Sequence, residues 1–280
     1  MDKKMSGISK PDTDISKLSG KSKHTEALAI APETVQLVWN YSKMSVTEVP
    51  DHWMDVLKKH QTIGANPSLW LAWFADCTII QSPVYKKMKA RMLKGEKLLE
   101  LGCGFGQNMR KLCVKGVAAE DLFGFYTDRI LIEAGYDLFV DRSTQMTFFT
   151  GDIVAGTFEF ERFHDKFNIV FASMFFHLFD WTEQVAIAKQ VVNFLRKEPG
   201  SMIFGQQIGH IKPGLYQVGR ESAGYAHNTA TLQQMWDLVG SETKSTWHVQ
   251  GIMDVNDNIA ALTQDDNTRC LRFWIRRLWN

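Results

Sequence analysis

The chain has 280 residues, of which 45% are hydrophobic and 22% are charged, and its formal net charge is +1. This length and composition are ordinary for one large globular domain, or for one domain with an extension. The near-neutral charge argues against a nucleic-acid enzyme, which is expected to carry a basic face. The four cysteines have no paired short spacing, so they predict neither a metal site nor a disulfide framework and fit a reducing compartment.

Residues 1–31 are rich in Lys, Ser and Asp and contain no apolar run of the signal-peptide type. A segment of such low hydrophobicity predicts a disordered tail. No stretch of the sequence approaches the roughly 20 apolar residues that are needed to cross a bilayer. We therefore expect a cytoplasmic location and no insertion into a membrane.

Residues 32–94 predict a helical N-terminal extension that acts as a lid. Val35, Val38 and Trp39 recur at helical spacing, and Pro83 is suited to open a further helix. The segment Leu69–Ile80 is apolar nearly all round, so it is either buried or covers a cavity. The aromatic content of 12% leaves the same choice open, because such rings either pack a core or line an apolar substrate pocket.

Residues 95–280 alternate between short apolar runs and amphipathic stretches, which predicts strands that alternate with helices. This alternation implies a mostly parallel sheet with helices on both faces. Two β-like runs end the chain, as in the seven-stranded, Rossmann-like class I methyltransferase fold of the α/β class. The expected strands are 96–101, 122–125, 146–150, 167–175, 201–207, 246–255 and 269–279, and the expected helices are 107–114, 129–140, 181–196 and 229–239.

A glycine-rich loop, ELGCGFG from Glu100 to Gly106, follows a predicted strand and opens a predicted helix. Gly102, Gly104 and Gly106 permit a tight turn and a close approach of the backbone to a ligand, at the sheet edge where open α/β sheets bind cofactors. A dinucleotide fingerprint needs another glycine three residues further on, and this chain has none. We therefore expect a domain that binds S-adenosylmethionine (SAM), with Glu100 facing the cationic methionine portion of this cofactor. The alternatives are a structural turn and, for Glu100, a charge that complements the helix dipole.

Two other strand ends supply candidate contacts to the adenosine portion. Asp152 follows the third predicted strand, where it would accept a hydrogen bond from the adenine amine while Ile153 packs on the ring. After the second strand, Asp128 would hold the ribose hydroxyls, and Tyr126 would stack on the cofactor or hydrogen-bond to it. Each aspartate has a structural alternative, since Asp152 suits a turn or helix cap and Asp128 suits the N-cap of the next helix.

Three residues are candidates for handling the methyl acceptor. His177 ends the fourth predicted strand, and His227 and Arg220 belong to residues 211–228, whose Gly, Pro and polar residues predict an irregular, mobile cover. A histidine could act as general base for a phenol or a carbon acid. A carboxylate acceptor needs no base and could be held by Arg220. Structural histidines and a solvated surface arginine are the alternatives.

Several short motifs occur together in a characteristic order. They are Tyr41-Ser42, LLELGCGFGQ at 98–107, GYDLF at 135–139, HLFDW at 177–181, and His227-Asn228 followed by Trp236 and Gly240. Over roughly residues 35–255 the chain resembles the fungal secondary-metabolite methyltransferases. The resemblance implies methyl transfer from S-adenosylmethionine to a small apolar molecule and places Gln107 in the cofactor site. Family members with these motifs methylate the carboxyl group of farnesylated aromatic polyketides in meroterpenoid pathways, so carboxyl O-methylation is the reaction implied.

Two segments depart from that family. An acidic residue ends the second strand in the family where this chain has Tyr126, and residues 61–71 lack the usual aromatic-Pro-Cys-Ile-Gly pattern. These departures keep open a second hypothesis, a methyltransferase-fold protein that cyclises or isomerises a natural product without methylating it. An RNA or protein methyltransferase is a third hypothesis, which the near-neutral charge disfavours. We expect no nucleic-acid partner, and a homodimer stays open beside a monomer.

Overall fold

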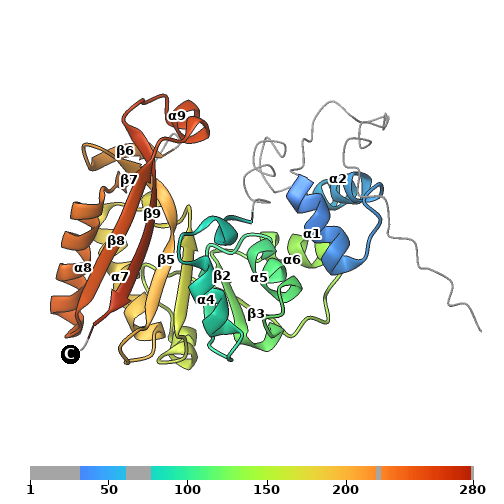
Figure 1. The fold of residues 1–280 in the computed structure, drawn as a ribbon, viewed down its shortest axis with the longest axis horizontal. Helices are drawn as coiled ribbons and strands as arrows, with labels where there is room; N and C mark the ends of the chain where they lie inside the picture. Colours follow the sequence, from blue (N-terminus) through green and yellow to red (C-terminus); the bar gives the residue numbers. More distant parts are fainter. Residues whose placement is uncertain (1–31, 61–76, 219–221, 279–280) are drawn as a thin grey trace, which may run out of the picture.

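The computed structural model describes residues 32–60, 77–218 and 222–278. Its centre is a seven-stranded sheet in the order β3-β2-β1-β4-β5-β9-β8 (Figure 1). Strands β1 to β5 pair in parallel, and β9 lies antiparallel between β5 and β8. The strands are β1 (Leu98–Leu101), β2 (Leu122–Tyr126), β3 (Thr147–Thr150), β4 (Ile169–Ser173), β5 (Met202–His210), β8 (Trp247–Asp254) and β9 (Thr268–Arg277). The predicted Rossmann-like class I methyltransferase fold is confirmed.

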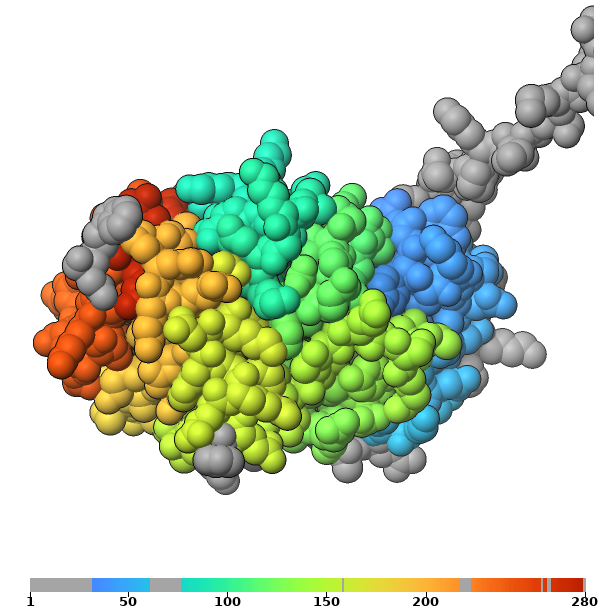
Figure 2. Space-filling model, turned by 90° about the horizontal axis from the view of Figure 1, so that it is seen from below, coloured from blue at the N-terminus to red at the C-terminus, as the bar shows by residue number. Residues whose placement is uncertain are grey.

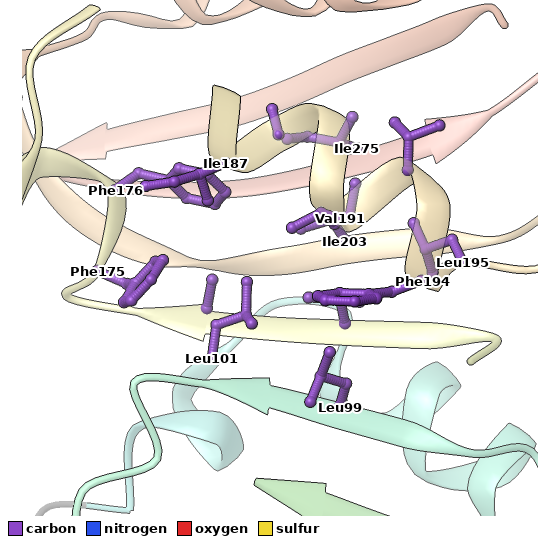
Figure 3. Close-up of a cluster of buried hydrophobic side chains, with 14 of the residues drawn as sticks. Leu99, Leu101, Phe175, Phe176, Ile187, Val191, Phe194, Leu195, Ile203 and Ile275 are labelled. Carbon is purple, nitrogen blue, oxygen red and sulfur yellow. The ribbon is translucent and has the colours of Figure 1, made fainter. Parts of the chain in front are cut away.

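Helices pack on both faces of this sheet, because its central strands are buried on both sides. One face packs against α7 (Trp181–Phe194) and α8 (Thr229–Thr243), and Figure 3 shows α7 lying over β4 and β5 in this core. The other face packs against α4 (Tyr85–Met92) and α5 (Gln107–Val114). The N-terminus of α7 is fixed by a capping box between Asp180 and Glu183, the third residue of the helix.

The N-terminal helices α1 (Pro32–Ser42) and α2 (Val49–Lys59) pack on α6 (Ile130–Phe139). They form one end of the molecule, coloured blue in Figure 2. Val35 and Val38 are buried as their spacing predicts, whereas Trp39 is 36% exposed, so its place on the buried face was predicted wrongly. The predicted tail 1–31 and most of the segment Leu69–Ile80 lie outside the described residues, and the lid role of residues 32–94 stays a prediction.

Three elements, in two segments of the chain, were not predicted from the sequence. Residues 211–228 were expected to be irregular, but they contain β6 (Gly214–Val218) and β7 (Ser222–Ala226), which pair antiparallel as a separate two-stranded sheet. A helix, α9 (Asp257–Thr263), lies between β8 and β9 and begins where the Asn256 side chain accepts a hydrogen bond from the backbone N–H of Ile259. The Gly and Pro content of residues 211–228 favoured an irregular segment, and α9 has only seven residues, too few for helical periodicity to identify it.

Short 3-10 helices complete the described fold. They are η2 (Thr78–Gln81), η3 (Ala119–Asp121), η4 (Phe158–Phe163) and η5 (Phe176–Leu178). Among the helices of the described ranges, none has the length and apolar character required to traverse a bilayer.

Candidate functional site

The glycine loop leaves β1 and enters α5 with three glycines in the left-handed region of backbone conformation. Gly102, Gly104 and Gly106 have φ values of 69°, 54° and 69°. A Cβ added to Gly102 would lie 2.9 Å from the Phe175 ring, and one added to Gly106 would lie 2.7 Å from the Arg110 guanidinium. At these two positions glycine is therefore required by packing within the protein as well as by backbone conformation, a reason that the sequence did not reveal.

Glu100 lies in β1, directly before the loop, and is 2% exposed. Its Oε1 accepts a hydrogen bond of 2.7 Å from Asn108 Nδ2, while Asn108 Oδ1 accepts one of 3.1 Å from the backbone N–H of Ile79. Burial raises the pKa of Glu100 to about 8, and the hydrogen bond from Asn108 and the charge of Arg110 oppose that rise. Asn108 therefore fixes the orientation of this carboxyl group, a role that the sequence analysis did not assign.

Two buried acceptor atoms at this loop have no hydrogen-bond partner within the described structure. They are Oε2 of Glu100 and Oε1 of Gln107, a residue that is 7% exposed. An acceptor that is buried without a donor costs free energy, so a ligand that brings N–H groups would be stabilised here. S-adenosylmethionine carries an ammonium group on its methionine portion. Glu100 and Gln107 therefore fit this cofactor, and their contacts with it remain a proposal.

The end of β2 contains the two candidate ribose residues. Tyr126 is the last residue of β2, and burial, followed by the nearby charge of Asp128, raises its pKa to about 12. Asp128 is exposed, and its Oδ1 accepts a hydrogen bond of 2.8 Å from the backbone N–H of Ile130 at the start of α6. One oxygen of Asp128 therefore forms a turn before α6, whose N-cap is Arg129 and not Asp128, and the ribose role stays a prediction.

The end of β3 contains the two candidate adenine residues. Asp152 Oδ1 accepts hydrogen bonds of 2.9 Å and 3.0 Å from the backbone N–H groups of Val154 and Ala155, so one of its oxygens forms a turn. Ile153 is 2% exposed and belongs to the core beneath α7. Its surroundings in the structure are therefore those of a core residue, and contact with adenine remains a prediction for both residues.

His177 lies in η5, directly beyond β4, and is 3% exposed. Its Nδ1 is buried without a partner among the described residues, and burial lowers its pKa to about 3. The ring stacks on Tyr216 of β6 at 6.5 Å, and Tyr216 Oη donates a hydrogen bond of 3.0 Å to the His177 carbonyl oxygen. The β6–β7 hairpin therefore holds His177 at the edge of the sheet where the methyl acceptor is expected.

His227 is fully buried, and both of its ring nitrogens are within hydrogen-bond distance of protein groups. Nδ1 lies 3.1 Å from Thr231 Oγ1, and Nε2 lies 3.1 Å from Gln184 Oε1. Because Gln184 Nε2 already donates to two backbone carbonyls, its Oε1 must accept, so His227 Nε2 is the donor. Burial lowers the pKa of His227 to about 4. This arrangement favours the structural alternative for His227, while Arg220 lies outside the described residues.

A row of polar side chains near the carboxyl end of the sheet was missed by the sequence analysis. Ser173 of β4 pairs with Gln206 of β5, and Gln206 pairs with Arg272 of β9, so the three side chains share one face. Ser173 Oγ and Arg272 Nε are buried without partners in the described part of the chain, while Arg272 Nη1 pairs with Asp254. The available signal was a polar residue in each strand, at the end of β4 for Ser173 and in the middle of β5 and β9 for Gln206 and Arg272.

Comparison with known proteins identifies relatives of this chain. It is 32% identical over 216 residues to the asnovolin E/chermesin D methyltransferase nvfJ of Aspergillus novofumigatus, covering 75% of this chain and 77% of that protein. It is 29% identical over 260 residues to the O-methyltransferase atr3 of Stereocaulon alpinum, covering 91% of this chain and 75% of that protein. No family model matches the chain.

Solved structures of the same fold have much lower sequence identity. A Burkholderia thailandensis 1,6-didemethyltoxoflavin-N1-methyltransferase has a TM-score of 0.52 and 10% identity, covering 91% of this chain and 93% of its own. The [4+2]-cyclase SpnF has a TM-score of 0.50 and 12% identity, covering 70% and 82%. These two neighbours share the fold alone, whereas the fungal relatives also share sequence along most of the chain. The chain therefore belongs to the fungal secondary-metabolite methyltransferases and is an S-adenosylmethionine-dependent enzyme.

Proposed function

We propose that this enzyme methylates the carboxyl group of a small apolar natural product of the polyketide-terpenoid type. S-adenosylmethionine supplies an electrophilic methyl group, so the reaction is an in-line displacement in which a carboxylate oxygen forms the new O–C bond and the C–S bond breaks. The protein then has to hold the acceptor in line and exclude water. The names of the fungal relatives support this proposal, as atr3 is an O-methyltransferase and nvfJ is named as a methyltransferase of asnovolin E and chermesin D.

The observation that carries the proposal is the burial of the two candidate bases, His177 and His227, together with the hydrogen-bond contacts of both His227 ring nitrogens with Thr231 and Gln184. Burial lowers the pKa of His177 to about 3 and that of His227 to about 4, so both imidazoles are neutral and weakly basic near neutral pH. A phenol has a pKa near 10 and needs a base of matched strength to lose its proton. A carboxylic acid is already ionised near pH 7, so it needs no base. The buried histidines therefore favour a carboxylate acceptor.

The acceptor carboxylate needs a cationic partner in a site of this kind. Arg272 is half-buried on the sheet face that also presents Ser173 and Gln206, and one of its N–H groups is unpaired in the described structure. A guanidinium binds a carboxylate in bidentate fashion. We assign this role to Arg272, with Arg220 as the candidate outside the described residues. We further propose that His177 lies beside the acceptor and that the enzyme works in the cytoplasm.

The test is a methyl-transfer assay with S-adenosylmethionine labelled in its methyl group. The acceptors are a farnesylated aromatic carboxylic acid and the matched phenol that lacks the carboxyl group. We expect label in a product of the acid only, released by mild alkali because it is a methyl ester. Label in an alkali-stable ether formed from the phenol would contradict carboxyl methylation while leaving methyl transfer itself intact.

A further inference from the structure

Arg110 of α5 is a buried cation with an unusual number of contacts. It is 1% exposed and forms a two-point ion pair with Asp141, with Nε–Oδ2 and Nη2–Oδ1 distances of 2.9 Å and 2.7 Å. Its guanidinium also lies over the Phe139 ring, 4.4 Å from the centroid. A charge held this far from water needs a close and complete set of partners. These contacts therefore hold the Arg110 side chain in a single orientation.

The remaining nitrogen of the Arg110 guanidinium, Nη1, contacts the glycine loop. Nη1 donates a hydrogen bond of 2.5 Å to the carbonyl oxygen of Phe105, which lies between Gly104 and Gly106. Gly135 of α6 lies against the same carbonyl oxygen, so closely that a Cβ added to this glycine would collide with it. The Phe105 carbonyl is therefore in contact with Arg110 on one side and with α6 on the other. Arg110 thereby fixes the loop that we propose as the cofactor site.

The N-terminal helix α1 contacts the other side of the ion pair. Tyr41 Oη donates a hydrogen bond of 2.8 Å to Asp141 Oδ2, the oxygen that also accepts from Arg110 Nε. Its neighbour Ser42 donates to the Phe139 carbonyl at 2.7 Å, a contact that fixes α1 to α6 without involving the ion pair. Two adjacent residues therefore dock the same helix, and only one of them belongs to the network that reaches the glycine loop.

We propose that Tyr41, Asp141 and Arg110 are positioning residues that couple the docking of α1 to the shape of the glycine loop, so that cofactor affinity depends on a hydroxyl outside the cofactor site. The chain of contacts is continuous, from Tyr41 through Asp141 and Arg110 to the Phe105 carbonyl. The inference rests on the proposed position of the cofactor at the glycine loop.

The charge of Arg110 gives the network a second effect on the site. Arg110 is one of the groups that oppose the rise in the pKa of Glu100 caused by burial. Holding the guanidinium in place therefore favours the ionised carboxylate that would face the ammonium group of the cofactor. Lys at position 110 would keep the charge but lose the fork that contacts Asp141 and the loop together.

The test compares Tyr41→Phe with Ser42→Ala by calorimetric titration with S-adenosylhomocysteine. Each variant removes one hydroxyl from the docked face of α1, so they match in size of perturbation. We expect the dissociation constant to rise about fivefold in Tyr41→Phe, a part of the effect of losing a hydrogen bond to a charged group. In Ser42→Ala it should stay within about twofold of wild type. Equal effects of both variants, or no effect of either, would overturn the coupling.

A double-mutant cycle with Arg110→Lys separates positioning from general loss of stability. If Tyr41 acts through Arg110, the effects of the two variants on the dissociation constant are not additive, whereas Ser42→Ala and Arg110→Lys add. Additive effects for both pairs would contradict the proposed route. Gly104→Val provides the control for the site itself: if that variant binds S-adenosylhomocysteine like wild type, the cofactor position is wrong. If it does not bind while Tyr41→Phe binds normally, only the coupling fails.

Discussion

Glu100 links the stability of the protein to pH, because its pKa is raised from 4.5 to about 8. Between these values the unfolded chain has lost this proton while the folded chain retains it. Folding stability contributed by Glu100 therefore falls as pH rises from 4.5 towards 8. In Glu100→Gln this decline should disappear, which denaturant unfolding without cofactor would reveal. A variant whose free energy of unfolding keeps the pH dependence of wild type would show that Glu100 is ionised in the fold throughout.

The same substitution should weaken cofactor binding. A bound ammonium group would favour the ionised form of Glu100, because a nearby positive charge stabilises a carboxylate. A neutral amide at this position removes that charged acceptor, which corresponds to about 1.5–3 kcal/mol for a hydrogen bond to a charged group. Calorimetry with S-adenosylmethionine on wild type and Glu100→Gln measures that loss. Equal affinities, in a variant that is folded, would return Glu100 to its alternative role beside the helix dipole.

His227 gives the opposite dependence on pH. Its pKa is lowered from 6.5 to about 4, so the stability it contributes is present above 6.5 and is lost as pH falls towards 4. In His227→Ala the donor to Gln184 Oε1 disappears, so the free energy of unfolding at pH 7 should drop by about 1–3 kcal/mol, with a weaker loss on acidification. Thermal unfolding across this pH range tests both effects. A stable variant with methyl-transfer activity that climbs steeply with pH would instead identify His227 as a base.

At the scale of single elements, the turn after β3 separates a structural role from a binding role. Asp152→Ala removes an acceptor for the backbone N–H groups of Val154 and Ala155. We expect a loss of stability of about 1 kcal/mol, as for a helix cap, together with a loss of about 1.5–3 kcal/mol in the free energy of cofactor binding. Denaturant unfolding and calorimetry measure the two separately. Reduced stability with an unchanged dissociation constant would leave Asp152 with the turn alone.

The strands of the main sheet could be predicted because apolar runs and following polar residues mark them locally. Leu98–Leu101 is buried on both faces, and its sequence is apolar apart from Glu100. The β6–β7 pair could not be predicted in this way, because it depends on contacts between the two strands and with η5 rather than on apolar alternation. α9 is only seven residues long, too short for helical periodicity to identify it.

The residues of the candidate site also divide into those that the sequence could predict and those that it could not. The loop glycines and Glu100 are adjacent in sequence, so a motif finds them. Arg110, Asp141 and Tyr41 are far apart along the chain and meet only because α1 and α6 pack together on α5. The residue types did not indicate a buried network, because an arginine on a helix is usually exposed to solvent. Arg272 was missed for a related reason, as its neighbours Ser173 and Gln206 come from other strands.

At the scale of the whole molecule, the N-terminal helices and the sheet meet around the glycine loop. α1 contacts α5 and α6, and the loop opens α5, so the first helix of the described fold lies close to the proposed cofactor site (Figure 1). His177 lies in η5 beyond the carboxyl end of β4, and Gln206 lies within the neighbouring strand β5. This arrangement agrees with the proposed position of the cofactor at the glycine loop and of the acceptor over β4 and β5.

The most direct test of the account is calorimetric titration of S-adenosylhomocysteine into wild type, Gly104→Val and Gly200→Val. Both glycines have positive φ, 54° for Gly104 and 91° for Gly200, so valine strains the backbone at either site. Gly200 precedes β5 at the opposite end of the sheet, and a Cβ there would meet nothing within 4 Å. We predict micromolar-range binding by wild type and Gly200→Val, and no measurable binding by a folded Gly104→Val. Binding by Gly104→Val with the wild-type dissociation constant would contradict the placement of the cofactor at this loop.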